Sequence, residues 1–166
     1  MKKEAQLELS FGMIFSIILI IIFISFAFYA VQKFLKIQDT VKIGQFIENL
    51  QSDTDKIWKS NQGSQEVEYS LPSKIEYVCF VDYSSAKKGK NQEFYKELKQ
   101  FYYENENLIF YPGGSAEELN AFDIKHVDIG KITENENPFC IENLKGKVKM
   151  IIKKNYEDDL VMIDQQ

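Results

Sequence analysis

The stretch FGMIFSIILIIIFISFAFYAV, residues 11–31, contains no charged side chain. A bilayer core about 30 Å thick needs about 20 apolar residues in a helix, so this stretch is long enough to span one. A core helix of a soluble domain is the alternative. The rest of the chain, however, is too small to surround a fully apolar helix on every side. The sequence therefore predicts a helix buried in a membrane or in a similarly apolar environment.

A cleaved secretory signal would also place an apolar stretch near the N-terminus. Here the stretch is too long, and no Ala-x-Ala site closes it, because Ala27 and Ala30 are three residues apart. The following residues, from Tyr29 to Gln32, continue into helix-compatible sequence. We therefore expect the segment to be retained in the mature protein.

The helical pattern continues beyond Val31. Apolar residues recur mostly at spacings of three, four and seven, which is typical of one apolar stripe on a helix: Phe34, Leu35, Val41, Phe46, Ile47, Leu50, Ile57 and Trp58. No proline precedes Pro72. The sequence predicts one nearly continuous helix from Leu7 to Ser60, closed by Gly63 as a left-handed cap. Its amphipathic half is expected to pack on the C-terminal domain, with Phe46 and Trp58 on the sheet.

From Glu66 onward the pattern is that of short strands rich in β-branched and aromatic residues. Strands are predicted in 67–71, 75–81, 107–111, 121–129 and 160–163, a hairpin in 139–141 and 148–152 around 144–147, a helix in 92–103 and a polar loop in 84–91. The fold class is therefore α+β: a long N-terminal transmembrane and amphipathic helix packed on a small, mostly antiparallel β-sheet domain with one short helix.

Charge is distributed unevenly along the chain. Residues 1–38 hold four lysines and two glutamates, a net charge of +2, and residues 39–166 hold 16 lysines and 23 acidic residues, a net charge of −7. The sum is the −5 of the whole chain, which contains no arginine. Nucleic-acid binding needs a positive surface that displaces counterions, and arginine supplies its most specific contacts. We therefore expect no nucleic-acid partner.

The two cysteines, Cys79 and Cys140, leave two possibilities open. In an exported domain they can form a disulfide, and closing so long a loop adds roughly 4 kcal/mol of stability. Alternatively, they are two small buried residues on neighbouring strands. Two cysteines and one histidine are too few for a tetrahedral zinc site, so no metal site is expected.

No pattern of catalytic residues is evident. His126 lies in what reads as an alternating strand, which predicts a solvated or hydrogen-bonded strand position, and no G-x-S-x-G motif accompanies it. Residues 112–115 (PGGS) lack the lysine of a phosphate-binding loop, and the acidic runs 117–118 and 157–159 lack an EF-hand pattern. We therefore expect no catalytic residue and no cofactor, and predict that the protein is not an enzyme.

The N-terminus carries the most informative motif. A short basic start, Lys2-Lys3, precedes an acidic and polar segment, residues 4–10, and then the apolar helix. This order resembles the class III signal of type IV pilins and of related archaeal pilin-like proteins. The resemblance covers the first 60 residues by motif and the rest by layout only. It implies that a prepilin-type peptidase removes the leader on the cytoplasmic side and that the apolar helices then bundle into a filament core.

The resemblance places processing at Lys3, Glu4, Ala5 and Gln6, with two cut sites open. A cut after Lys3 puts Glu8 at the fifth mature position, where the family has its glutamate. A cut after Ala5 makes Gln6 the first mature residue and has the usual small residue before it, which favours this site slightly. A carboxylate buried in an apolar bundle needs a partner. The N-terminal amine of a neighbouring subunit can pair with Glu8 and set the register of assembly; otherwise Glu8 stays hydrated among lipid headgroups.

The predicted organisation is a leader (1–5), a transmembrane and assembly helix (6–32), its amphipathic continuation (33–62) and an extracytoplasmic β-rich domain (63–166). Lysines flank the helix on both sides, so the positive-inside rule does not decide its orientation. The short leader, the cysteine pair and the resemblance favour a cytoplasmic N-terminus and an extracellular domain. We expect a pilin-like subunit of a surface filament, in contact with membrane lipid and associating with itself through the helix. The alternative is a single-pass membrane protein that does not polymerise and whose domain binds a surface partner.

Overall fold

A computed structural model of the chain describes residues 11–166. The chain divides into two compact units, Met1–Gln38 and Asp39–Gln166. The described part of the first unit is entirely helical, and the second holds the end of the same helix and all the strands. The fold class predicted from the sequence, α+β with a long N-terminal apolar helix, is confirmed.

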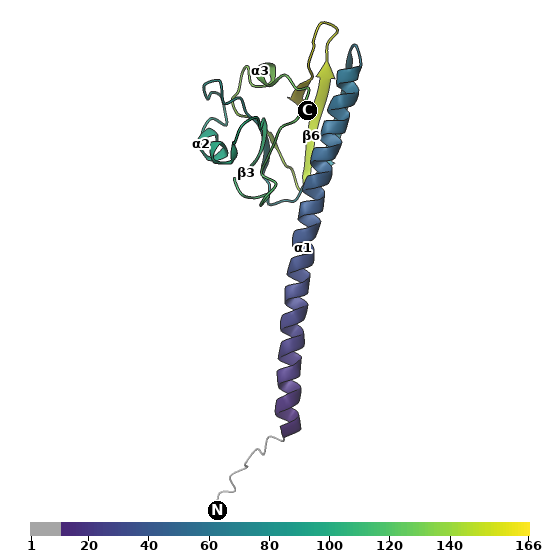
Figure 1. The fold of residues 1–166 in the computed structure, drawn as a ribbon, viewed down its shortest axis with the longest axis vertical. Coiled ribbons are helices and arrows are strands. Elements are labelled where there is room, and N and C mark those ends of the chain that lie inside the picture. Colours follow the sequence, from purple (N-terminus) through teal and green to yellow (C-terminus); the bar gives the residue numbers. More distant parts are fainter. Residues whose placement is uncertain (1–10) are drawn as a thin grey trace, which may run out of the picture. The chain divides into compact units, whose positions relative to one another are not determined.

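The helix α1 spans Phe11–Lys59 without a break, as its lack of proline allows (Figure 1). Its C-terminal end agrees with the prediction to within one residue, but the predicted cap is wrong. Gly63 begins the first strand and does not take a left-handed conformation. Instead Lys154 reaches from a neighbouring strand and donates hydrogen bonds to the carbonyl oxygens of Trp58 (2.8 Å) and Ser60 (3.1 Å). A lysine side chain thus satisfies carbonyl groups that the end of a helix leaves open.

The strands form two antiparallel sheets. The first has the order β1-β6-β7, with β1 Gly63–Ser70, β6 Lys147–Lys154 and β7 Met162–Gln165. The second has the order β4-β3-β2-β5, with β4 Ala121–Phe122, β3 Leu108–Tyr111, β2 Tyr77–Phe80 and β5 Phe139–Glu142. Figure 1 shows β6 beside the C-terminal part of α1.

The predicted hairpin in 139–152 is wrong in its pairing. Lys145 and Gly146 form the tight turn, both with positive φ, and a single bridge joins Leu144 to Lys147. Beyond that bridge the two strands belong to different sheets: β5 pairs with β2, and β6 pairs with β1 over eight residues. The longer ladder and the tertiary partners therefore override the local hairpin.

The predicted helix in 92–103 is shorter than expected. It consists of α2, Tyr95–Leu98, followed by a 3₁₀ turn, η1, Lys99–Phe101, and the chain is extended at Tyr102. A second short helix, α3, Ile129–Ile132, begins at the last residue of the predicted strand 121–129. Its N-terminus is capped by Asp128, whose carboxylate accepts a hydrogen bond from the backbone N–H of Lys131 (3.0 Å).

The main core joins the end of α1 to both sheets. Phe46 is buried and contacts Tyr69 of β1 and Phe110 of β3, with ring centroids 5.4 and 5.7 Å apart. Ile43 and Leu50 are buried on the same face of the helix. The predicted packing of Phe46 on the sheet is therefore confirmed. A second, smaller cluster joins α2 to the second sheet and contains Cys79, Val81, Leu98, Ile109 and Cys140.

The predicted apolar stripe of α1 belongs only in part to this core. Phe34 and Val41, which the spacing assigned to it, are 60% and 51% exposed. The buried residues of α1 begin at Ile43. Helical periodicity identifies residues that share a face, but it does not determine where along the helix the domain begins to cover that face.

Candidate functional site

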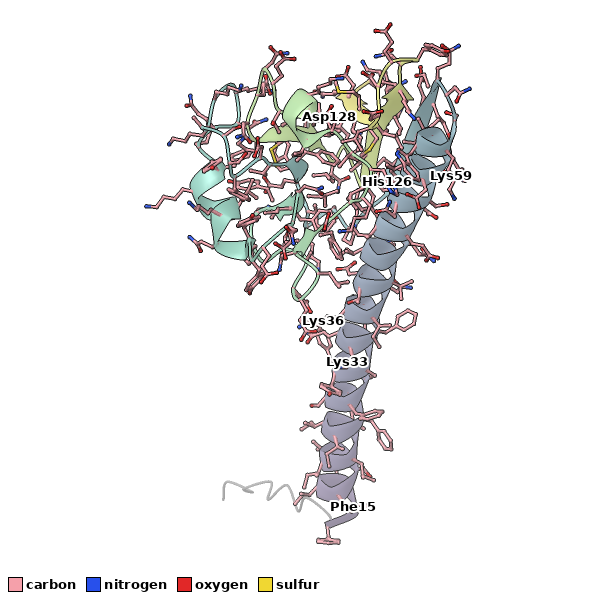
Figure 2. All side chains as sticks on the ribbon, turned by 45° about the horizontal axis from the view of Figure 1, so that its top comes forward. Phe15, Lys33, Lys36, Lys59, His126 and Asp128 are labelled. Carbon is pink, nitrogen blue, oxygen red and sulfur yellow. A yellow bond between two sulfur atoms is a disulfide. The ribbon has the colours of Figure 1, made fainter. Side chains whose placement is uncertain are left out.

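The described part of the first unit presents an exposed apolar surface. Every residue from Phe11 to Gln38 is exposed, and the first charged side chain after Phe11 is Lys33. Among the described residues α1 is the one helix long and apolar enough to cross a membrane. Figure 2 shows side chains projecting on all sides between Phe15 and Lys33. Such a surface needs lipid or another apolar partner.

The polar groups within this segment are satisfied by the helix itself. Ser16 Oγ donates a hydrogen bond to the carbonyl oxygen of Gly12, and Ser25 Oγ donates one to that of Ile21, both at 2.8 Å. Each bond runs back four residues, a geometry that lets serine lie in an apolar environment without an unsatisfied hydroxyl. These two serines therefore do not interrupt the apolar surface of the helix.

The residues predicted for processing and register, Lys3, Glu4, Ala5, Gln6 and Glu8, lie outside the described residues. The leader and the two cut sites therefore remain predictions from the sequence. Between Glu8 and the first described residue lie only Leu9 and Ser10. The predicted processing segment is thus immediately followed in the sequence by the exposed apolar helix.

Cys79 and Cys140 form a disulfide in the structure. They lie directly opposite each other on β2 and β5, within the ladder that joins these two strands. Both side chains are buried, with exposed fractions of 0% and 6%. The sequence left open a disulfide or two buried residues on neighbouring strands. In the structure the two cysteines are buried on neighbouring strands and are also bonded to each other. Such a bond is typical of oxidising compartments outside the cytoplasm.

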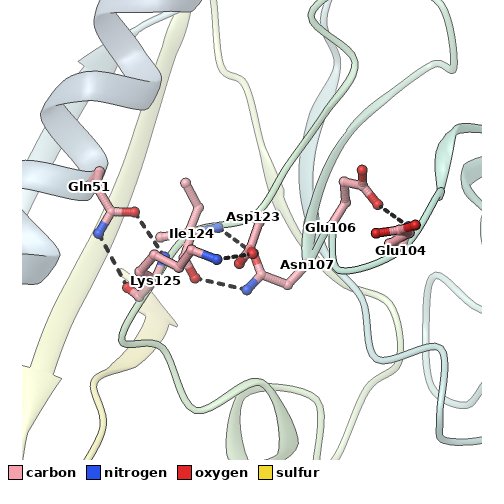
Figure 3. Close-up of polar contacts among 7 residues, drawn as sticks. All are labelled: Gln51, Glu104, Glu106, Asn107, Asp123, Ile124 and Lys125. Carbon is pink, nitrogen blue, oxygen red and sulfur yellow. Dashed lines mark hydrogen bonds and ion pairs between the residues drawn. The ribbon is translucent and has the colours of Figure 1, made fainter.

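The last turns of α1 hold one segment of the domain, residues 124–126. Gln51 accepts a hydrogen bond from the backbone N–H of Lys125 (2.9 Å) and donates one to its carbonyl oxygen (3.4 Å). Asn107 makes the same pair of contacts with Ile124, both at 2.9 Å. Figure 3 shows the segment between these two side-chain amides. Amide side chains therefore take the place of a neighbouring strand, which is why the predicted strand 121–129 ends at Phe122.

His126 is the centre of this contact, and the predicted strand position for it is wrong. The residue lies in a turn with φ of +66°, an uncommon conformation outside glycine. Its ring stacks on Trp58, with centroids 3.7 Å apart and planes 4° from parallel. Its Nδ1 donates a hydrogen bond to Asp55 Oδ1 (2.9 Å). We call Gln51, Asp55, Trp58 and His126 the helix latch. Figure 2 shows His126 near the end of the helix, not far from Lys59.

The sequence contained a partial signal for the helix latch. Gln51, Asp55 and Trp58 are spaced by four and three residues, so they share one face of α1. That signal predicts a common partner but does not identify it. His126 is 71 residues from Asp55 in the sequence, and only the tertiary structure brings the two side chains together.

The helix latch makes stability depend on pH. The hydrogen bond from His126 is the main cause that holds the pKa of Asp55 below its usual value of 3.8, with Gln51 and Lys59 adding to it. Because the pKa is lower in the folded state, this contact stabilises the fold above about pH 4, and the stabilisation is lost as pH falls through the lowered pKa. We expect Asp55→Asn to destabilise the domain at pH 5 and to have little effect near pH 2. Urea unfolding at both pH values, followed by fluorescence, measures the difference.

A matched control for this experiment is Glu134→Gln, which changes an exposed carboxylate of the domain that is not part of the helix latch. We expect this variant to change stability by a similar small amount at both pH values. An equal effect of Asp55→Asn at pH 5 and near pH 2 would show that the ionised carboxylate does not stabilise the contact.

One carboxylate in each of the acidic runs 117–118 and 157–159 has a lysine partner. Asp158 accepts hydrogen bonds from Lys131 Nζ (2.6 Å) and Asn155 Nδ2 (2.8 Å), and Lys131 holds its pKa below the usual range. Glu117 lies 3.7 Å from Lys74 Nζ. Within residues 11–166 no group of three or more His, Cys, Asp or Glu side chains is arranged to hold a metal ion. The acidic runs therefore contribute ion pairs to the domain surface.

Neither protein-family models nor curated proteins nor solved structures give a match to this chain. The role of the protein therefore rests on its own residues and contacts. These establish a long apolar N-terminal helix whose C-terminal part packs on a β-rich domain. That combination fits a pilin-like or a membrane-anchored protein.

Proposed function

We propose that this chain is a pilin-like structural subunit of a cell-surface filament, exported and assembled through its hydrophobic N-terminal helix. The observation that carries the proposal is the exposed apolar surface of α1, which does not end with the charge-free stretch. Residues 11–32 form about 33 Å of helix, enough for a bilayer core. Exposed apolar side chains nevertheless continue at Phe34, Leu35, Ile37 and Val41. A single membrane anchor does not need these additional apolar side chains. A subunit packed among the helices of other subunits would bury them.

The order of the first ten residues supports the same proposal. The basic pair Lys2-Lys3, the segment from Glu4 to Glu8 and the apolar helix follow one another as in a class III signal. A prepilin-type peptidase is the partner that this order implies. The buried disulfide supports export of the domain, because the cytoplasm keeps thiols reduced. The flanking lysines left that orientation undecided.

The proposal gives the β-rich domain a structural role and no enzymatic one. His126, the only histidine, has its ring face on Trp58 and its Nδ1 on Asp55, so its position is explained by the attachment of the helix. A general base needs a ring nitrogen within reach of a substrate proton. The neighbours of His126 on α1 instead serve to hold one segment of the domain.

The alternative function is a single-pass membrane protein that does not polymerise and whose β-rich domain binds a surface partner. The length of the charge-free stretch favours it, because residues 11–32 match one bilayer core without any neighbour. The two functions differ in what happens to the N-terminus. A pilin-like subunit loses its leader, and a plain anchor keeps it.

The intact mass of the membrane-extracted protein tests the proposal. We expect the loss of residues 1–5, or of residues 1–3 if the cut follows Lys3. We further expect Glu8→Ala to be processed normally but to form few or no filaments, because the partner of the neighbouring N-terminal amine is removed. Mass spectrometry of the membrane fraction and electron microscopy of sheared surface material measure the two effects separately.

Glu134→Ala is the matched control, since this glutamate is exposed on the domain. It should leave both processing and filaments unchanged. An unprocessed N-terminus in the parent protein would support the plain anchor instead. Normal filaments from Glu8→Ala would remove the register role of Glu8 while leaving the filament itself in place.

A further inference from the structure

Positive charge gathers in one segment of an otherwise acidic domain. Residues 87–99, which we call the lysine segment, hold five lysines and two glutamates, a net charge of +3. The rest of the second unit holds 11 lysines and 21 acidic residues, a net charge of −10. The side chains of all five lysines in the segment are exposed: Lys87, Lys88, Lys90, Lys96 and Lys99. The segment therefore presents to solvent a charge opposite in sign to that of the domain around it.

The lysines of this segment also differ from other lysines of the domain in their partners. Within residues 11–166 none of the five forms an ion pair with a carboxylate. The lysines that do form ion pairs in the second unit lie outside the segment: Lys56, Lys74, Lys125, Lys131, Lys147, Lys149 and Lys153. The charge of the lysine segment is thus not neutralised by the described part of its own chain.

The loop that carries the first three of these lysines is held in place by a buried amide. Asn137 is 0% exposed, and its Oδ1 accepts a hydrogen bond from the backbone N–H of Asp82 (3.1 Å). Its Nδ2 donates hydrogen bonds to the carbonyl oxygens of Asp82 (2.7 Å) and Ala86 (3.3 Å). Its backbone exchanges two hydrogen bonds with that of Lys88, both at 2.9 Å. A loop fixed in this way presents its charges in a preorganised arrangement, which lowers the entropy cost of binding.

The short helix α2 is attached to the same loop through Tyr95. The hydroxyl of Tyr95 donates a hydrogen bond to the carbonyl oxygen of Ser85 (3.3 Å), and its ring lies against Tyr83 with centroids 5.1 Å apart. The side chain of Tyr95 is only partly buried, and Lys96 follows it directly. A tyrosine ring offers an apolar face beside a polar edge. The lysine segment therefore combines positive charges with a partly exposed aromatic ring.

The packing of the domain on its own helix leaves this segment open. Figure 1 shows α2 on one side of β3 and the part of α1 that belongs to the second unit on the other side. The face of the domain that carries α2 is therefore not the face that α1 covers.

We infer that the lysine segment binds a carboxylated polysaccharide at the cell surface. Lysine ammonium groups are point charges that pair with single carboxylates, whereas arginine, which suits planar phosphate and nucleic-acid recognition, is absent from the sequence. The ring of Tyr95 supplies an apolar face for a sugar ring, which a purely electrostatic partner does not need. The inference rests on export of the domain, which the proposed function and its alternative share, and does not require polymerisation.

The test uses the full chain in phosphatidylcholine nanodiscs, with immobilised polygalacturonate as the probe. We expect the parent to bind polygalacturonate but not neutral dextran, and binding to weaken as added salt screens the exposed charges. The triple variant Lys87→Gln/Lys88→Gln/Lys90→Gln should bind about tenfold more weakly. Its unfolding midpoint should not change, because the three side chains are exposed. Tyr95→Leu should bind about threefold more weakly, and Tyr95→Phe, which keeps the ring, should bind like the parent.

Lys145→Gln/Lys147→Gln/Lys149→Gln is the matched control, because it removes the same charge from three exposed lysines outside the lysine segment. We expect it to change binding less than about twofold. An equal loss in the two triple variants overturns the inference, as does equal binding of dextran and polygalacturonate. Equal losses in Tyr95→Leu and Tyr95→Phe overturn it as well, because a sugar contact requires the ring. Tighter binding to immobilised phosphatidylglycerol vesicles than to polygalacturonate would overturn it in favour of a lipid surface.

The inference and the proposed function fail separately. Processing of the N-terminus and filament formation should be unchanged in Lys87→Gln/Lys88→Gln/Lys90→Gln. A parent protein that is processed and forms filaments but does not bind polygalacturonate would overturn the inference and leave the proposed function standing. An unprocessed N-terminus in a protein that binds polygalacturonate through the lysine segment would have the reverse effect.

Discussion

Removing the disulfide between Cys79 and Cys140 is expected to lower the free energy of unfolding of the domain by about 4 kcal/mol. The bond closes a loop with a sequence separation of 61 residues, and a loop of that length restricts the unfolded chain by about this amount. Small domains have a total stability of about 5–15 kcal/mol, so the loss is a large part of it. The double variant Cys79→Ala/Cys140→Ala tests this without leaving a buried thiol. Urea unfolding followed by the fluorescence of Trp58, the only tryptophan, gives the difference.

Reduction of the parent protein provides the internal control. After unfolding and refolding in reductant, the parent should match the double variant, and reductant should leave the double variant unchanged. Because both sulfur atoms belong to buried residues, reduction of the folded domain is expected to be slow. Equal unfolding midpoints for the parent and the double variant would show that the bond does not stabilise the domain.

Replacing Phe46 by alanine is expected to destabilise the domain by about 3–5 kcal/mol, the usual cost of removing a fully buried phenylalanine. The ring is 1% exposed and contacts Tyr69 in the first sheet and Phe110 in the second. Its loss leaves a cavity where the helix meets both sheets. Nearby, Asp53 accepts a hydrogen bond from the Tyr69 hydroxyl (2.8 Å), so the polar attachment of the helix to β1 remains. Urea unfolding of the detergent-solubilised chain measures the change.

Phe34→Ala is the matched control, because the same residue type on the same helix is 60% exposed at position 34. We expect it to change the stability of the domain by less than about 0.5 kcal/mol. A large loss of stability from Phe34→Ala, or none from Phe46→Ala, would contradict the division of α1 into an exposed and a covered part.

The predictions from the sequence agree with the structure where the interactions that form an element are local in the sequence. The helix α1 was predictable because its signals are local: an uninterrupted apolar run, then apolar residues at helical spacing, with no proline. The strands β2 and β3 were predictable from short runs of β-branched and aromatic residues. The registers that join them, such as Cys79 opposite Cys140, depend on residues far apart in the sequence.

The errors lie where a distant partner replaces a local one. Residues 124 and 125 alternate like a strand, yet their backbone groups bond to the side chains of Asn107 and Gln51. The residues around Gly146 form the turn of a hairpin, yet β5 and β6 leave it for different sheets. In each case the backbone hydrogen bonds can be made equally well with the local partner or with the distant one. The packing of the core then determines which partner is used.

The apolar stretch FGMIFSIILIIIFISFAFYAV by itself determined that this protein has a long helix requiring an apolar environment, because in a helix a single segment satisfies its own backbone groups without water. Only the tertiary structure decided how far the domain covers that helix. The buried residues of α1 begin at Ile43. Near the C-terminal end of α1, the ring of His126 in the helix latch stacks on Trp58. The physical reason is that periodicity records which side chains share a face, whereas burial depends on which distant segments pack against it.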